Sequence, residues 1–204
     1  MARHREFCEA QALDAAIECF WRDGYEATSV RDLATQMGIA GTSLYNAFDD
    51  KRSLFRRALE RYLDETLRRR IAALESELPP EEAVRHFLIG SVERSLDDDQ
   101  RRGCFLVNSA LEVAPHDHAL GAYIGERLGE IESFFARTLT KAQAMGTIPA
   151  DRDAGDLARL LLGVTLGIRV LARARPDREL LEGLLRSALA LLDPPPPATG
   201  GQTP

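Results

Sequence analysis

The chain has 204 residues, of which 45% are hydrophobic and 28% are charged, and its net charge is −6. These values exclude a disordered, collagen-like or disulfide-stabilised chain, and the negative net charge excludes attraction of the whole molecule to nucleic acid or anionic lipid. Leu and Ala far outnumber Val and Ile, a bias that favours helices over strands and predicts an all-α protein.

Three helices are predicted in the N-terminal quarter of the chain. Apolar residues follow the 3.6-residue helical period over residues 6–23, and a glycine follows the last turn. A second, short helix begins at Thr28 or Ser29, whose hydroxyl can cap it, and ends before Gly38. After a tight turn, residues 42–48 form a third helix.

The remaining predicted helices are separated by proline, glycine and acidic breaks. The fourth begins at Asp49 or Asp50 and extends to about residue 77. Five more are predicted over residues 81–96, 103–114, 118–144, 154–174 and 177–192. The segment 194–204, rich in Pro and Gly, is predicted to be disordered. The result is about nine helices, divided near residue 50 into a small N-terminal unit and a larger C-terminal bundle.

Residues 28–48 have the layout of a helix-turn-helix. At 100° per residue, Leu44 and Phe48 define the buried side of the third helix. The polar side chains on its outward side are then Thr42, Tyr45 and Asn46. Hydroxyl, phenol and amide groups can hydrogen-bond to base edges or phosphates, which indicates DNA binding. Any three-helix unit also carries polar residues on its outer face, so an interface without DNA is the alternative.

Positive charge in this unit is limited. Residues 1–57 hold 8 Lys or Arg against 9 Asp or Glu. The segment therefore lacks the net positive charge that is typical of DNA-binding domains. Arg31 and Lys51 can each reach a phosphate, and helix N-termini add positive potential. We therefore expect attraction to DNA to come from the local placement of these groups.

Two segments resemble the N-terminal domain of the tetracycline-repressor (TetR) family: GYEATSVRDLATQMGI at 24–39 and SLYNAFDDKRSLF at 43–55. The resemblance implies an all-α homodimer. In that arrangement residues 1–50 form a helix-turn-helix DNA-binding domain, and residues 51–193 bind an effector and form the dimer. The fourth helix, residues 50–77, connects the two.

This resemblance implies a DNA-binding transcriptional regulator, a repressor that a small-molecule effector releases from a near-palindromic operator. The family's DNA-contact positions fall on Thr28, Ser29, Arg31, Gly41, Thr42, Ser43, Tyr45, Asn46, Ala47 and Lys51. Two of them depart from the family pattern. Ala47 stands where members often carry His or Tyr, and Gly41 stands where a longer side chain is common.

The segment GCFLVNSALE, residues 103–112, resembles a branch of the family that includes electrophile-responsive repressors. Cys104 is therefore a candidate sensing thiol, since a helix N-terminus and neighbouring arginines are typical of reactive thiols. The alternative is structural, because a free cysteine usually packs as a small hydrophobe. A small-molecule site needs a few polar groups on apolar walls, and the predicted pocket residues are Cys104, Phe105, Asn108, Glu112, Phe134 and Phe135.

The last two helices are predicted to form the dimer face. Their apolar runs suit a four-helix bundle with two helices from each subunit, as the resemblance implies. The predicted interface residues are Leu160, Gly163, Gly167, Leu184 and Leu185. Packing within one chain is the alternative for the same apolar faces. The arginine run at 68–70 is interpreted as the solvated face of the fourth helix.

No motif points to an enzyme, a cofactor or a metal site, because a glycine-rich phosphate loop and a nucleophile elbow are both absent from the sequence. His116 and His118 form a His-x-His pair without further ligands at a convincing spacing. Two alternatives stay open. One is a helical small-molecule-binding or protein-interaction module without DNA binding, favoured by the near-neutral N-terminal unit and by Ala47. The other is a metal-dependent helical enzyme.

No segment of the sequence has the features of a membrane span or a signal peptide. The most apolar stretch, 157–171, is interrupted by Arg159 and Arg169 and is too short to span a bilayer. Residues 1–11 lack the apolar core of a signal peptide. Three cysteines, an odd number, fit a reducing compartment. We therefore expect a cytoplasmic protein without a membrane partner.

Overall fold

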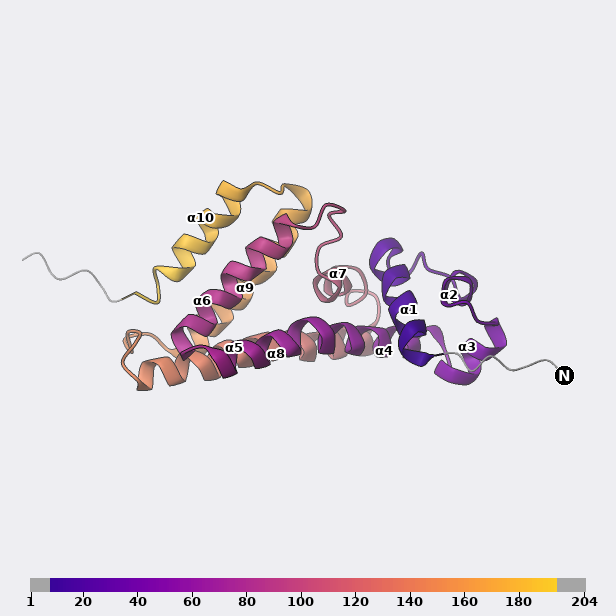
Figure 1. Ribbon diagram of the computed structural model, residues 1–204, viewed down its shortest axis with the longest axis horizontal. Coiled ribbons are helices and arrows are strands. Elements are labelled where there is room, and N and C mark those ends of the chain that lie inside the picture. Colours follow the sequence, from indigo (N-terminus) through magenta and orange to yellow (C-terminus); the bar gives the residue numbers. More distant parts are fainter. Residues whose placement is uncertain (1–7, 194–204) are drawn as a thin grey trace, which may run out of the picture. The chain divides into compact units, whose positions relative to one another are not determined.

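The computed structural model describes residues 8–193, and within that range all regular secondary structure is helical (Figure 1). The helices are α1 Glu9–Asp23, α2 Val30–Met37, α3 Gly41–Phe48, α4 Lys51–Leu63, α5 Arg69–Glu77, α6 Pro80–Leu96, α7 Phe105–Glu112, α8 His118–Ala144, α9 Ala154–Ala174 and α10 Arg178–Leu189. The all-α prediction is confirmed for these residues. Residues 6 and 7 of the first predicted helix and the segment 194–204, predicted to be disordered, lie outside the described residues.

Local sequence explains where the first helices begin and end. The backbone of Gly24 has a φ of 85° directly after α1, a conformation that glycine adopts without a steric penalty. A capping box between Ser29 and Asp32 starts α2, so two backbone donors of its first turn are paired. Gly38 ends α2 in the left-handed conformation, with a φ of 66°. Helix α1 packs against both α2 and α4.

The predicted fourth helix is one helical segment over residues 51–77, but it is not uniform. A π-helical turn, η1 (Asp64–Arg68), joins α4 to α5. A 3.6-residue periodicity does not reveal such a turn, because the single wider turn adds one residue without interrupting the apolar stripe. With residues 51–77 counted as one helix, the described part of the chain has the nine helices that were expected.

Helix α7 is shorter than predicted and ends at Glu112 instead of residue 114. Pro115 disfavours helical geometry in the residue before it, so the helix ends upstream. The Asp117 carboxylate then caps the next helix by accepting the backbone N–H groups of Ala119 and Leu120 at 3.0 and 2.9 Å.

The chain divides into two compact units. Among the described residues, the first unit contains 8–73 with 98–130, and the second contains 74–97 with 131–193. The first unit has an aromatic core formed by Phe20, Trp21, Tyr25, Phe55, Tyr62 and Phe105. In the second, α6, α9 and α10 pack against one another.

These units do not coincide with a boundary near residue 50. Helix α4 packs on α1 and on α7, so α4 and α7 belong to the same unit as the first three helices. The side chain of Phe55 shows the reason, since its ring contacts both Phe20 of α1 and Phe105 of α7. No helix in the described range is both long and apolar enough to cross a bilayer.

Candidate DNA interface

Helices α2 and α3 form a helix-turn-helix whose buried side is apolar. Leu33, Leu44 and Phe48 are almost completely inaccessible to solvent. On the opposite side of α3, Thr42, Tyr45 and Asn46 are exposed, and Tyr45 retains 52% of its accessible surface. The outward direction predicted for these three side chains is confirmed. A large apolar side chain that is this exposed is available to a partner surface.

The first turn of α2 presents a polar end. Ser29 accepts the backbone N–H of Asp32 at 3.1 Å, and Asp32 in turn accepts the backbone N–H of Ser29 at 3.1 Å. The hydrogen bonds from Ser29 hold the pKa of Asp32 below its ordinary value. Arg31 is exposed beside this cap. Ser29 and Arg31 therefore lie at the surface, where the prediction requires them.

Thr28 has a different role from the one predicted. Its side chain is 2% exposed, and its hydroxyl donates to the carbonyl oxygen of Gly24 at 2.6 Å. A buried and already bonded hydroxyl is not available to a phosphate or a base. The structure therefore removes the Thr28 side chain from the candidate DNA contacts and assigns it to the turn between α1 and α2.

The start of α3 exposes backbone donors. Its N-cap residue is Ala40, which offers no side-chain hydrogen bond to the first turn. Nothing lies within 4 Å of where a β-carbon at Gly41 would stand, so the backbone there is open to close approach. Uncapped N–H groups at a helix start attract anionic oxygens. Ser43 and Ala47 are half-buried.

Lys51 is held on the turn that precedes α2. Its ammonium nitrogen lies 4.4 Å from the centre of the Tyr25 ring and 3.5 Å from the carbonyl oxygen of Glu26. The neighbouring Arg52 forms an ion pair with Asp117 at 2.6 Å. The position of the Lys51 ammonium group therefore depends on the turn between α1 and α2.

The predicted pocket residues are distributed over both units. Cys104 is half-buried directly before α7, and its Sγ accepts the Tyr62 hydroxyl at 3.7 Å. Asn108 donates to the carbonyl oxygen of Arg102 at 2.7 Å, and Phe105 is buried in the aromatic core of the first unit. In the second unit, Phe134 and Phe135 are fully buried and pack on Phe87.

Glu112, another predicted pocket residue, lies at the end of α7 and contacts a distant turn. Its carboxylate accepts the backbone N–H of Glu26 at 3.0 Å, and its oxygens lie against Gly24. This carboxylate therefore connects the end of α7 with the turn between α1 and α2. Sequence periodicity did not reveal this contact, because nothing in the local pattern of α7 refers to a residue 86 positions away.

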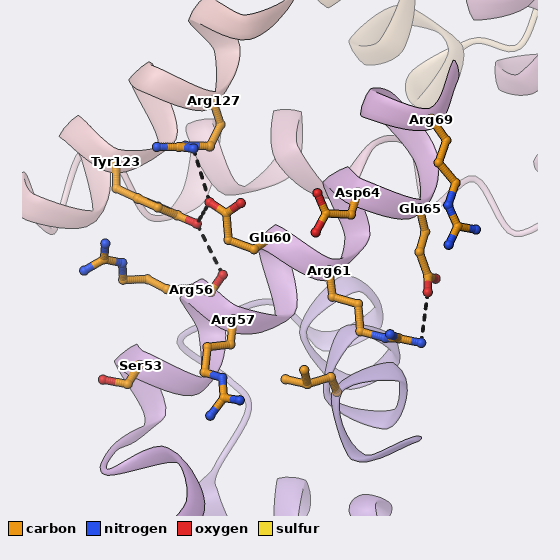
Figure 2. Close-up of a pocket in the computed structure, with 11 residues that line it drawn as sticks. Ser53, Arg56, Arg57, Glu60, Arg61, Asp64, Glu65, Arg69, Tyr123 and Arg127 are labelled. Atoms are coloured by element: carbon orange, nitrogen blue, oxygen red, sulfur yellow. Dashed lines mark hydrogen bonds and ion pairs between the residues drawn. The ribbon is translucent and has the colours of Figure 1, made fainter. Parts of the chain in front are cut away.

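A groove with a volume of about 760 Å³ lies in the first unit (Figure 2). Its lining is mostly charged and consists of Leu13, Ser53, Arg56, Arg57, Glu60, Arg61, Asp64, Glu65, Arg69, Tyr123 and Arg127. None of the predicted pocket residues is among them. Small-molecule sites are typically apolar with a few polar groups, so this groove does not fit the pocket that the sequence suggested.

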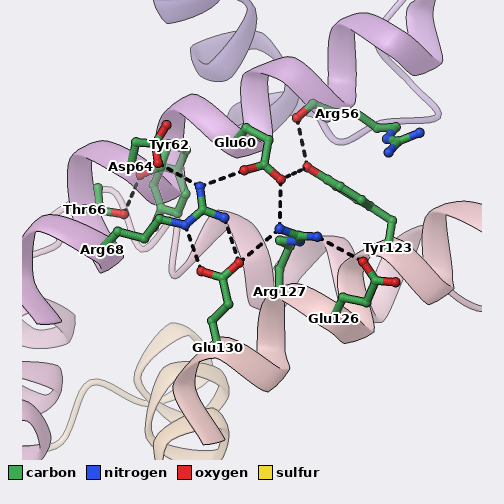
Figure 3. A network of polar contacts seen from close by, with 10 residues as sticks. All are labelled: Arg56, Glu60, Tyr62, Asp64, Thr66, Arg68, Tyr123, Glu126, Arg127 and Glu130. Atoms are coloured by element: carbon green, nitrogen blue, oxygen red, sulfur yellow. Dashed lines mark hydrogen bonds and ion pairs between the residues drawn. The ribbon is translucent and has the colours of Figure 1, made fainter. Parts of the chain in front are cut away.

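Next to the groove, Arg68 is surrounded by carboxylates (Figure 3). It forms ion pairs at 2.7 Å with Glu60, Asp64 and Glu130. Arg68 is therefore paired and only partly solvated, with 31% of its side chain exposed, whereas Arg69 is exposed as predicted. Burial by itself would raise the pKa of Glu60, but hydrogen bonds from Tyr123 and Arg68 and nearby positive charge lower it.

No cluster of three or more His, Cys, Asp or Glu side chains in residues 8–193 is arranged to hold a metal ion. His116 and His118 flank Asp117, whose carboxylate is bonded to Arg52 and to the start of α8.

Both halves of the chain match models of known protein families. Residues 12–58 match the family model of bacterial regulatory proteins, tetR family, and residues 80–188 match the tetracyclin repressor-like C-terminal domain. An uncharacterised HTH-type transcriptional regulator of Bacillus subtilis (strain 168), YezE, is 34% identical over 95% of this chain and 100% of its own length. The HTH-type transcriptional repressor ComR of Escherichia coli (strain K12) is 30% identical over 93% of this chain and 90% of its own.

The fold of this chain is also similar to that of a solved structure. A cysteine mutant of the TetR family transcriptional regulator CifR, complexed with 26-bp double-strand operator DNA, is 33% identical. The match has a TM-score of 0.83 and covers 94% of this chain and all of the CifR chain.

Proposed function

This chain belongs to the TetR family of bacterial regulatory proteins and is a DNA-binding transcriptional regulator; we propose that it is a repressor that a small-molecule effector releases from its operator. We assign it no catalytic activity and expect it in the cytoplasm, with the DNA that it regulates. Two recognition helices in one homodimer would enter successive major grooves, which requires half-sites about 34–36 Å apart or a multiple of that distance.

The observation that carries this proposal is the outward face of α3. Thr42, Tyr45 and Asn46 are all exposed there, and an asparagine amide can pair with both hydrogen-bonding groups of adenine in the major groove. Arg31 on α2 and Lys51 at the start of α4 are placed to contact phosphates on either side. Ser29, Gly41 and Ser43 complete the proposed contact set.

Positive charge is supplied locally, since the first 57 residues are nearly neutral. The uncapped start of α3 supports a phosphate contact by backbone N–H groups. Structures of the relative CifR hold operator DNA, which supports the same mode of binding for this chain. Because few charges take part, we expect affinity to depend strongly on two protomers binding together.

Exposed apolar residues on α9 support the proposed dimer face. Leu160 and Val170 retain 46% and 41% of their accessible surface. Nothing lies within 4 Å of where a β-carbon would stand at Gly163 or Gly167, so a partner helix could approach closely between them. Leu185 points into its own subunit and is 7% exposed. It is therefore removed from the predicted interface, whereas Leu184 is half-buried and remains in it.

For the effector we propose a thiol-reactive electrophile that is sensed at Cys104. The side chain is half-buried at the N-terminus of α7, so a small reagent can reach it more easily than the fully buried Cys19. In an addition to an activated alkene, the Cys104 sulfur would form a bond to one alkene carbon, and the thiol proton would end on the other. The added group would need space beside Tyr62, which contacts the sulfur.

The experiment that tests DNA binding is a selection from a genomic fragment library at two salt concentrations. A shared near-palindromic sequence that is bound less tightly at the higher salt would establish a sequence-specific dimer. If no fragment is enriched, the selection is repeated after the protein has been unfolded and refolded without ligand. Failure in both cases would favour the alternative, a helical module that binds small molecules or proteins but not DNA.

A further inference from the structure

The end of α7 is attached to the turn between α1 and α2 by one carboxylate. Glu112 accepts the backbone N–H of Glu26 at 3.0 Å. A β-carbon at Gly24 would lie 2.7 Å from one oxygen of the same carboxylate and 2.8 Å from the other. The carboxylate therefore fits against this turn only because position 24 has no side chain.

The same peptide segment also holds a proposed DNA contact. The backbone N–H of Glu26 donates to Glu112, and the carbonyl oxygen of Glu26 accepts the Lys51 ammonium group at 3.5 Å. The ammonium group also lies over the ring of Tyr25. Two residues further along, the Thr28 hydroxyl donates to the carbonyl oxygen of Gly24. This bond fixes the end of the turn directly before Ser29, the residue that caps α2.

We propose that Glu112 is a positioning residue for the DNA interface. Its carboxylate fixes the conformation of the turn between α1 and α2. This turn fixes the positions of the start of α2 and of the Lys51 ammonium group. This inference rests on the proposed DNA-binding function and adds the route by which α7 acts on the interface. All of these residues lie within the first compact unit, so the route consists of contacts inside one body.

Two substitutions separate hydrogen bonding from charge. Glu112→Gln removes the negative charge but keeps an oxygen that can accept the Glu26 N–H, whereas Glu112→Ala removes both. If the carboxylate acted only by repelling DNA, both variants would bind operator more tightly. If it positions the turn, only Glu112→Ala weakens binding. Leu111→Ala, at the neighbouring and 61% exposed position, is the matched control.

The first measurement is operator affinity over a series of salt concentrations, with the full-length protein and the sequence obtained from the genomic selection. We expect Glu112→Ala to weaken binding by about two- to tenfold, the range of one hydrogen bond. Loss of a Lys51 phosphate contact would also make the log–log salt dependence shallower, by about 0.9 for each contact. Glu112→Gln and Leu111→Ala should stay within about twofold of the wild type.

The second measurement is amide hydrogen exchange at Glu26 in the free protein. Exchange at this amide should be faster in Glu112→Ala than in the wild type, while amides in the middle of α1 exchange at unchanged rates. Unchanged exchange at Glu26, or equal operator affinity in Glu112→Ala and the wild type, would overturn the proposal. The exchange measurement needs no DNA, so a wild type that enriches no operator would count against the proposed function while exchange still tests the positioning role.

Discussion

The backbone amide of Glu26 and the carboxylate of Glu112 are separated by 86 positions in the sequence and are hydrogen-bonded at 3.0 Å. Two further contacts connect the segment before α7 with α1. The indole N–H of Trp21 donates to the carbonyl oxygen of Arg102 at 3.2 Å, and the Arg102 guanidinium pairs with Glu18 at 2.7 Å. The region around α7 is therefore joined at one end to α1 and at the other end to the turn between α1 and α2.

Tyr45→Ala should abolish specific operator binding and leave the dimer folded. Each lost base or phosphate contact of good geometry costs about 1–3 kcal/mol, and a homodimer loses it twice. Because Tyr45 is 52% exposed, the change in unfolding free energy should stay within about 0.5 kcal/mol. Fluorescence anisotropy with labelled operator, together with sedimentation velocity, measures both effects. Met145→Ala, at a 62% exposed position directly after α8, serves as the control, and normal binding by Tyr45→Ala would show that α3 is not the recognition helix.

Gly24→Ala should destabilise the protein, and part of the loss should depend on Glu112. The φ of 85° strains any residue with a β-carbon, at a cost of about 1–3 kcal/mol. The new methyl group would also overlap the Glu112 carboxylate. Urea unfolding of Gly24→Ala should therefore show a larger loss in the wild-type background than in Glu112→Ala. Equal losses in both backgrounds would mean that the carboxylate does not press against this turn.

Glu60→Gln should reduce the sensitivity of the fold to acid. The pKa of Glu60 lies below its ordinary value of 4.5 in the folded protein, so the folded state favours the charged form. Its contribution to stability is complete above pH of about 4.5 and is lost as the pH falls through the lower folded pKa. Unfolding free energy between pH 7 and pH of about 3 should thus decline less in Glu60→Gln than in the wild type. The more exposed Glu126, which pairs with Arg127, provides the control variant Glu126→Gln, and parallel curves for Glu60→Gln and wild type would contradict the prediction.

Leu160→Glu should convert the dimer into monomers. The substitution places a charge on the proposed α9 interface, where burying an unpaired carboxylate is costly. Sedimentation velocity at micromolar concentration would show the shift, and operator affinity should fall with it. Leu111→Glu adds the same charge to an exposed leucine on α7 and should remain dimeric. A dimeric Leu160→Glu protein would place the subunit interface elsewhere.

Alkylation with N-ethylmaleimide should release the protein from operator DNA, and Cys104→Ser should abolish this response. Cys8 is exposed and will also react, so Cys8→Ser is needed to show that its modification has no effect on binding. Mass spectrometry of the treated protein would report which sulfur carries the adduct. If Cys104→Ser is still released by the reagent, the effector is not sensed at this thiol.

Much of the helical framework follows from local chemistry. The predicted ranges 118–144 and 154–174 coincide with α8 and α9, because prolines, glycines and acidic caps mark those ends directly in the sequence. The outward direction of Tyr45 was predictable for a similar reason. Once Leu44 and Phe48 define the buried side of α3, the 100° step between residues determines where every other side chain points.

Other assignments required the contacts between elements. An apolar or polar residue on a helix does not reveal which distant segment covers it, so Leu185 was expected at a dimer face and is buried in its own subunit. For the same reason the sequence did not reveal the ion pairs of Arg68 with Glu60 and Glu130, or the hydrogen bond of Glu112 with the turn after α1. Periodicity along one helix determines a direction, whereas the partner in that direction is determined by packing between segments far apart in the chain.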